Sequence, residues 1–261
     1  MKQFDVTLTN YAYGILNQHP MTSLMVRIFL PKVDHQFFAL IYSYFRWLDD
    51  QVDGDELTTV EKEKLLARAY STIYTSKVNA PQFPEKCLLE SLSYGDKNNL
   101  PVRFPIKQMA TAIEMDMKRI GEIPTKEQLR QLCLLRVCSY LNMLKILTKD
   151  GSLMEIPPDY GIACDEIHIL RDIDEDFSRG IFNFSIEDVN KYRLNINRLN
   201  HPSWQPWIHY KIKNAGVLLK SGYLSLLKTG PSRYTGMCLL NLSKYWKCWL
   251  DLKAKYRSDN K

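Results

Sequence analysis

The twelve prolines of the chain divide it into long segments in which helices can form. A proline inside a helix removes a backbone hydrogen bond and clashes with the preceding turn, so helices are confined to the stretches between prolines. Within these stretches apolar side chains recur three and four residues apart, as in Ile41, Phe45, Leu48 and Val52. Helices are therefore predicted within the proline-free windows 32–80, 106–123, 125–156, 159–201, 207–230 and 232–261.

The segments that separate these windows have the composition of loops. Pro, Gly and Asn gather in them, at 79–86, 95–105, 155–161 and 200–206. The sequence shows no alternating strand pattern of useful length and no internal repeat, and its eleven glycines are few for a Gly-turn-rich sandwich or barrel. We therefore predict a single all-α domain over residues 1–261, a helical bundle around a central cavity.

Charge and hydropathy limit the partners of the chain. The longest largely apolar run, 37–45, is about half as long as a bilayer span requires. Residues 1–10 lack the apolar core of a secretory signal, which predicts a cytoplasmic protein. The net charge of +6 comes without an RNA-binding signature, zinc-finger spacing or helix-turn-helix pattern, so we expect no nucleic-acid partner. Residues 244–261 interleave Lys and Arg with Trp, Leu and Tyr; a solvated helix face is the favoured interpretation, and peripheral membrane contact stays open.

Two acidic helix faces carry the functional signal. In the first window, Tyr42, Arg46, Asp49 and Asp53 fall within about 60° of one another at helical spacing. Apolar residues cover the rest of that helix, which predicts burial. Buried carboxylates cost several kcal/mol unless they are paired or bound to a cation, so these two are expected to hold a metal or meet a partner.

The second face lies in the window 159–201. Asp165, His168, Asp172 and Asp176 fall within about 80° of one another, on a helix that also has an apolar side. One such face is most simply a solvated surface, but two matching faces favour metal binding. Carboxylate pairs one turn apart could hold two or three Mg²⁺ ions around a diphosphate and neutralise its charge as it departs.

The motifs that contain these faces resemble the squalene/phytoene synthase family. The resemblance runs from Leu30–Gly54 to Ile169–Asp176 and spans roughly residues 20–190. It implies the all-α isoprenoid synthase fold and Mg²⁺-dependent transfer of prenyl groups from prenyl diphosphates. It also implies roles for residues at matching positions: Tyr42 near the reacting carbons, Arg46 and Arg171 near the phosphates, and as metal ligands Asp49, Asp53, Asp172 and Asp176.

The chain departs from the family pattern at several positions. Where the family has Ser-Phe upstream of Leu30, this chain has Thr22, Ser23 and Leu24, so a hydroxyl remains but the aromatic residue is lost. Asp165 and His168 replace the family's Gln and Asn, and Asn183 replaces a Tyr. With Arg179, these residues are expected to bind substrate or diphosphate: Thr22, Ser23, Asp165, Arg179 and Asn183. His168 is open to three interpretations: a hydrogen-bonding or ligating substitute for Asn, a general base, or a polar residue satisfied by Asp165 or Asp172.

Three functions remain open at this point. Head-to-head condensation of two C15 or C20 prenyl diphosphates is favoured, as the resemblance implies. Bulky residues in the middle window, at 132–141, would narrow a tunnel for two chains. The alternatives are therefore cyclisation of one prenyl diphosphate or its transfer to a non-prenyl acceptor, and a non-catalytic assembly or scaffold relative. Chain length, use of NADPH and oligomeric state are left undecided.

Overall fold

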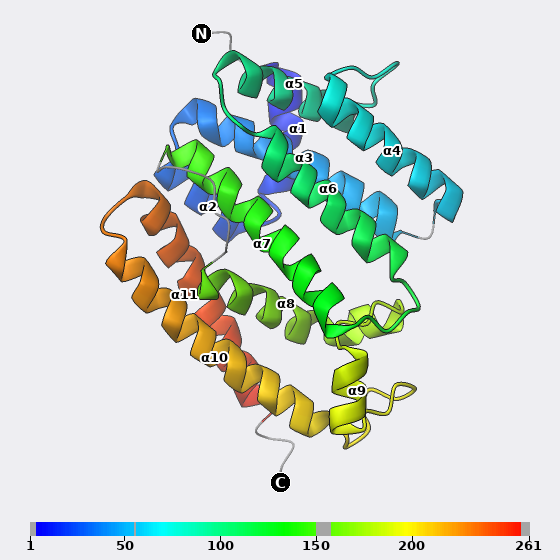
Figure 1. Cartoon of the computed structure of the whole chain (residues 1–261). Coiled ribbons are helices and arrows are strands. Elements are labelled where there is room, and N and C mark those ends of the chain that lie inside the picture. The colour runs from blue at the N-terminus through cyan, green and yellow to red at the C-terminus, as the bar shows by residue number, and fades with distance from the viewer. Residues whose placement is uncertain (1–3, 55, 150–157, 257–261) are drawn as a thin grey trace. The chain divides into compact units, whose positions relative to one another are not determined.

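A computed structural model describes residues 4–54, 56–149 and 158–256 (Figure 1). Helices and their connections make up all of these residues and no strand occurs among them, which confirms the all-α prediction. The helices are α1 (Val6–Leu16), α2 (Pro20–Phe29), α3 (Lys32–Asp53), α4 (Thr59–Thr75), α5 (Phe83–Lys97), α6 (Arg103–Lys118), α7 (Lys126–Thr148), α8 (Asp159–Ser178), α9 (Ile186–Tyr192), α10 (Trp204–Lys228) and α11 (Arg233–Lys255).

Every predicted window contains a helix, but α1, α2 and α5 lie outside the windows, and α5 begins inside the predicted loop at 79–86. Two other helices begin before their window does. Pro105 lies in the first turn of α6 and Pro206 in the first turn of α10. A proline is tolerated there because the first N–H groups of a helix have no partner within it. Residues 155–157 of the predicted loop at 155–161 lie outside the described residues, and the prediction is wrong from Asp159 on, where α8 begins.

The internal packing divides the chain into two compact units. Unit 1 comprises Met1–Met117, Cys138–Met154 and Ser232–Met237, and unit 2 comprises Lys118–Val137, Glu155–Pro231 and Cys238–Lys261. The boundary therefore falls inside α7 and again inside α11. The single-domain organisation stays a prediction.

In unit 1, α3 is the helix around which others assemble. It packs along both α1 and α5, and also contacts α2 (Figure 1). Phe37, Leu40, Leu48 and Val52 of α3 are completely buried in this packing. The apolar majority of the helix thus faces neighbouring helices, which fixes the direction of its remaining, acidic face.

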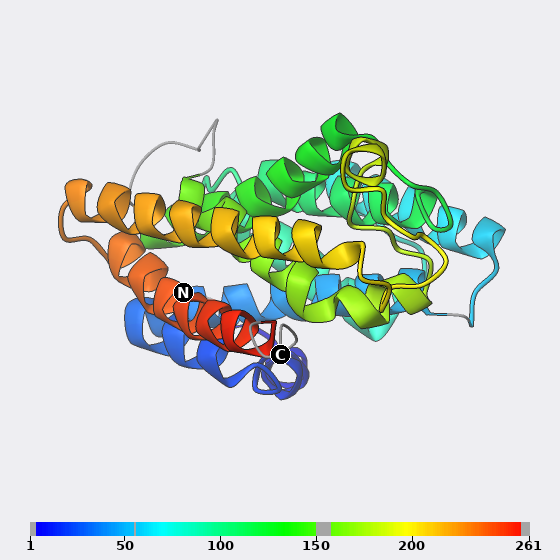
Figure 2. The ribbon, with the colours of Figure 1, turned by 90° about the horizontal axis from the view of Figure 1, so that it is seen from below.

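In unit 2, α8 packs along α10, with α9 against the same partner (Figure 2). Gly222 of α10 allows the close approach, because a Cβ atom there would lie 2.2 Å from the Cβ of Tyr160 on α8. The start of α10 adds a buried aromatic cluster in which Trp204 and Trp207 meet Phe184. These contacts hold the acidic helix α8 in place.

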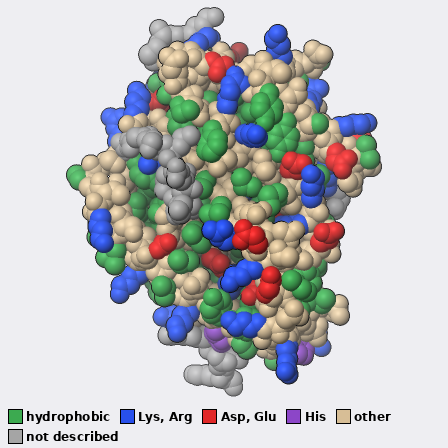
Figure 3. All heavy atoms as spheres, in the orientation of Figure 1, with side chains coloured by type: hydrophobic (Ala, Val, Ile, Leu, Met, Phe, Trp, Pro, Cys, Tyr) green, Lys and Arg blue, Asp and Glu red, His purple; other side chains and the backbone are tan. Residues whose placement is uncertain are grey.

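Two further observations concern the hydropathy of the described helices and the distribution of surface charge. None of these helices combines the length and apolarity needed to cross a bilayer. On the face drawn in Figure 3, Lys and Arg side chains are interspersed with Asp and Glu.

Candidate active site

The first acidic face lies on α3 as the spacing predicted. Tyr42, Arg46, Asp49 and Asp53 share this helix in unit 1. The expected burial holds for the apolar face only, since the side chains of Arg46 and Asp49 are 46% and 41% exposed. Arg46 forms ion pairs with Asp50 at 2.7 Å and with Asp49 at 3.5 Å. The carboxylates are therefore accessible to a ligand.

The electrostatics of this face favour a bound cation. Partial burial, followed by the nearby Asp53 carboxylate, raises the pKa of Asp49 to about 7, and the Arg46 guanidinium acts in the opposite direction. Asp116 of α6 also raises the pKa of Asp49. Clustered carboxylates of this kind repel one another, and a metal ion would relieve the repulsion. Helical spacing on α3 could not single out Asp116, because it lies on a different helix.

Tyr42 is the aromatic member of the same face. Its ring stacks near Phe38, with centroids 6.0 Å apart, and meets the edge of the His19 ring at 5.5 Å. Burial raises the pKa of Tyr42 to about 12, so its hydroxyl stays protonated at neutral pH. His19 comes from the turn before α2, a contact that helical spacing on α3 could not reveal.

The second acidic face lies on α8 in unit 2. Arg171 forms a bidentate ion pair with its neighbour Asp172, in which Nε donates to Oδ1 at 2.7 Å. Asp176, one turn further on, accepts a hydrogen bond from Asn183 at 2.6 Å. Burial, and after it the Asp172 carboxylate, raises the pKa of Asp176 to about 6. Both predicted carboxylates are partly exposed, beside a guanidinium, as on α3.

Asn183 connects Asp176 to a buried arginine that the sequence did not single out. Arg119, just after α6, donates to the Asn183 side-chain oxygen at 2.7 Å and to the Phe182 carbonyl oxygen at 2.6 Å. The Asn183 amide therefore accepts from Arg119 at one end and donates to Asp176 at the other. Because Asn183 lies on a connection after α8, only the fold brings these groups together.

Asp165 and His168 are engaged elsewhere on α8. Asp165 is buried and forms an ion pair with Arg136 of α7, with Nε–Oδ1 at 3.2 Å. His168 Nε2 lies 2.6 Å from the Tyr245 hydroxyl of α11, so the expectation that Asp165 or Asp172 would satisfy this ring is wrong. Burial, and after it Arg171, lowers the pKa of His168 to about 4, which keeps the imidazole neutral. Helical spacing could not foresee partners on α7 and α11.

Three further predicted residues lie beside the two faces or on a neighbouring helix. Ser23 of α2 is buried and donates to the side chain of Asn17 at 2.8 Å, and Thr22 precedes it on the same helix. Arg179, at the end of α8, forms an ion pair with Glu175 at 3.0 Å. Roles for these residues in substrate binding remain predictions.

The donor set at both faces suits a hard divalent cation. Within the described ranges, no three His, Cys, Asp or Glu side chains form a closed metal-binding group. Each face instead offers carboxylates one turn apart with a guanidinium beside them. Such an open set fits Mg²⁺, which keeps several waters and completes its coordination with substrate phosphate oxygens.

Comparison with known proteins identifies the family to which the chain belongs. The sequence model of the squalene/phytoene synthase family matches residues 16–252. The crystal structure of squalene synthase HpnC from Alicyclobacillus acidocaldarius is similar with a TM-score of 0.73 and 16% identity, covering 96% of this chain and 95% of that one. A dehydrosqualene synthase structure with a bound ligand gives a TM-score of 0.68 and 18% identity, covering 97% of each chain. No curated protein sequence matches significantly.

The two structural similarities establish the fold, and the sequence match establishes the family. At 16% and 18% identity the structures show the all-α isoprenoid synthase fold and nothing finer. The matched range 16–252 contains both acidic faces and Asn183. The chain belongs to the squalene/phytoene synthase family.

Proposed function

We propose that the protein is a Mg²⁺-dependent synthase that condenses two C15 or C20 prenyl diphosphates head to head and releases diphosphate. Family membership supports an isoprenoid synthase that binds prenyl diphosphate. The proposal of two substrates rests on one observation, the same set of metal-binding groups on two helices. Both α3 and α8 present two partly exposed carboxylates one turn apart beside an arginine. Two such sets suit two diphosphates.

In this proposal the carboxylates hold the metal ions, and the arginines contact the diphosphates. The residues that would hold Mg²⁺ are Asp49, Asp53, Asp172 and Asp176. When bound, Mg²⁺ would stabilise the negative charge of a departing diphosphate. Arg46 pairs with Asp50 and Arg171 with Asp172 in the structure, and both guanidinium groups would contact non-bridging phosphate oxygens when a diphosphate is bound.

Two neighbouring groups would support the ionised substrate. Tyr42 presents a protonated phenol and a ring face beside α3's carboxylates, and aromatic faces stabilise carbocations. Asn183 would orient the Asp176 carboxylate for metal binding, because its amide fixes one oxygen and is itself fixed by Arg119. With its pKa lowered to about 4, His168 is a weak base, so we assign it to hydrogen bonding with Tyr245 rather than to proton removal.

The direct test is product analysis. Purified protein would be incubated with C10, C15 or C20 prenyl diphosphates, with and without Mg²⁺ and NADPH, and products identified by mass spectrometry. A product with twice the carbon number supports condensation, and a further gain of hydrogen with NADPH would show a reductive step. A product with the substrate's own carbon number would identify a cyclase, and release only with an added acceptor would identify a transferase.

Matched variants connect the activity to the acidic faces. Asp49→Ala and Asp172→Ala should each abolish Mg²⁺-dependent diphosphate release. Asp174→Ala is the control, because Asp174 lies on the same helix as Asp172, is exposed and pairs only loosely with Lys255 at 3.7 Å. Full activity in either of the first two variants would contradict the proposal. No release by the wild type, with no thermal stabilisation by Mg²⁺ and a diphosphate analogue, would favour the non-catalytic alternative.

A further inference from the structure

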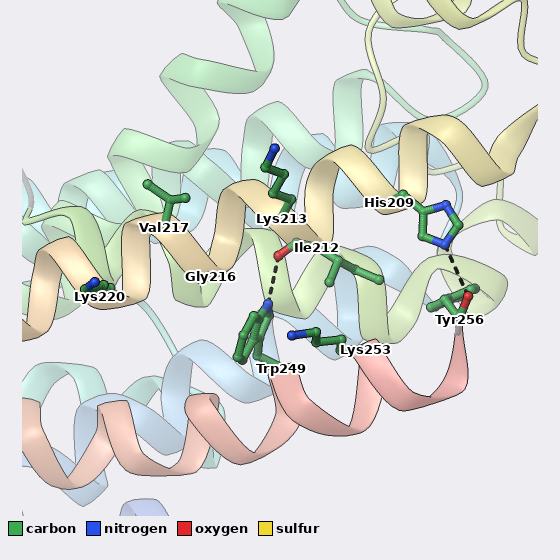
Figure 4. A pocket seen from close by; sticks show the side chains of 9 residues that line it. All are labelled: His209, Ile212, Lys213, Gly216, Val217, Lys220, Trp249, Lys253 and Tyr256. Carbon is green, nitrogen blue, oxygen red and sulfur yellow. Dashed lines mark hydrogen bonds between the residues drawn. The ribbon is translucent and has the colours of Figure 1, made fainter. Parts of the chain in front are cut away.

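A basic groove lies in unit 2, away from both acidic faces in the sequence. It runs between α10 and α11 and has a volume of about 380 Å³. Lys213 and Lys220 contribute from α10, and Lys253 contributes from α11. Figure 4 shows Trp249 and Lys253 directed from α11 toward α10.

Specific contacts build the floor of this groove. The Trp249 indole donates to the Ile212 carbonyl oxygen of α10 at 2.7 Å. The ring can reach the α10 backbone because residue 216 is glycine, where a Cβ atom would lie 2.6 Å from the indole. His209 Nε2 lies 3.2 Å from the Tyr256 carbonyl oxygen at one end of the groove. The aromatic floor is therefore a fixed part of the helix pair.

The positive charge at the groove meets no carboxylate among the described residues. Lys213 and Lys220 are exposed, and Lys253 lies over the Trp249 ring at 4.9 Å. In the described part of the chain, no carboxylate forms an ion pair with any of the three. Three ammonium groups at one groove, accompanied by His209, match an anionic ligand.

Exposed apolar side chains near the groove indicate which class of anionic ligand it would bind. Val217 is 61% exposed between the two lysines of α10, and Leu224 continues the same helix face. Leu250 is 48% exposed on α11, and the exposed Trp246 packs against Trp249 with centroids 5.8 Å apart. Lys, Trp and aliphatic residues together are typical of surfaces that lie in the membrane interface. A nucleic acid would leave the aliphatic side chains in water.

We propose that the α10–α11 groove docks the protein on an anionic phospholipid bilayer. A headgroup phosphate would lie among Lys213, Lys220 and Lys253, while Val217 and Leu250 enter the boundary of the acyl chains. The proposal does not depend on the reaction that the acidic faces support. It would place an enzyme of this family where prenyl chains concentrate.

The test is co-sedimentation of the full chain with vesicles. Wild type should bind phosphatidylcholine vesicles containing about 30% phosphatidylglycerol and bind pure phosphatidylcholine weakly, with affinity falling as salt rises. Lys213→Ala/Lys220→Ala should weaken binding about 25-fold, at about fivefold per lysine near an anionic surface. Lys64→Ala/Lys97→Ala removes the same charge from exposed positions in unit 1 and should leave binding within about twofold.

A second variant separates a bilayer from other anions. Val217→Ser/Leu250→Ser keeps every charge, and should weaken vesicle binding while circular dichroism stays unchanged. Equal binding to both vesicle types, no binding by wild type, or equal loss in the two lysine pairs would overturn the proposal. So would tight binding of duplex DNA with no effect of Val217→Ser/Leu250→Ser, which would identify a nucleic-acid surface. Displacement from vesicles by millimolar inorganic phosphate alone would identify a free-phosphate site and also overturn it.

Discussion

Replacing Asn183 with Leu would break the connection between a buried arginine and the second acidic face. The variant loses one acceptor of Arg119 and the donor to Asp176 while keeping the same branched side-chain shape. A hydrogen bond to a charged group contributes about 1.5–3 kcal/mol, and the bond to Asp176 counts for less because that carboxylate is partly exposed. We therefore expect Asn183→Leu to lower the free energy of unfolding by about 2–3 kcal/mol, or the melting temperature by about 4–12 °C.

Thermal and denaturant unfolding would measure this loss. A double-mutant cycle with Arg119→Met should give a coupling energy of about 1.5–3 kcal/mol, since the two side chains share one charge-assisted hydrogen bond. Asn214→Leu on α10 is the control for the change of residue type. A coupling energy below about 0.5 kcal/mol would refute the reasoning from the structure.

The same variant also tests the proposed metal site, with a separate readout. Removing a group that orients a ligand typically weakens metal binding about 10- to 100-fold. Asn183→Leu should therefore need that much more Mg²⁺ for half-maximal thermal stabilisation in the presence of a diphosphate analogue. A loss of stability with unchanged Mg²⁺ dependence would leave Asn183 a structural residue and remove its orienting role.

Three other predictions follow from the described contacts. Folding raises the pKa of Asp49 to about 7, so the folded chain binds the proton of this carboxyl group more tightly than the unfolded chain does. The stability of the Mg²⁺-free protein should therefore fall as pH rises from about 4 to 7. Asp49→Asn should flatten that profile in denaturant titrations. Gly222→Ala should cost about 1–3 kcal/mol because its Cβ would overlap the start of α8, whereas Gly14→Ala, with open space around it, should not destabilise in the same melts. Tyr245→Phe should cost about 1–3 kcal/mol by removing the hydrogen-bond partner of the half-buried His168, and an unchanged melting temperature would contradict that pairing.

The sequence predicted the helical class and the two acidic faces because both depend on local spacing. Pro positions locate the helix windows, and a period of 3.6 places Asp49 beside Asp53 and Asp172 beside Asp176 whatever the rest of the chain does. The same local reasoning placed Asp165 and His168 in the second set as if their side chains were equally available.

Contacts between distant segments explain what local spacing could not predict. Asp165 is neutralised by Arg136 on α7, and His168 meets Tyr245 on α11. Arg119 acts through Asn183, and it lies far from that residue in the sequence. The partners of a buried polar group are set by tertiary packing, so periodicity indicates which face a residue occupies but not which group satisfies it.

The division of the units inside α7 and α11 has a consequence for how the protein is made. Unit 1 includes Ser232–Met237, and unit 2 includes the chain from Cys238 on, so both draw on segments made after the first 231 residues. Neither unit can complete its packing before the chain beyond residue 231 has been made, and no single cut in the chain yields one unit intact. The long sequence separation of these contacts slows folding, and because α7 and α11 each contribute to both units, the folding of one unit cannot be separated from that of the other by truncation.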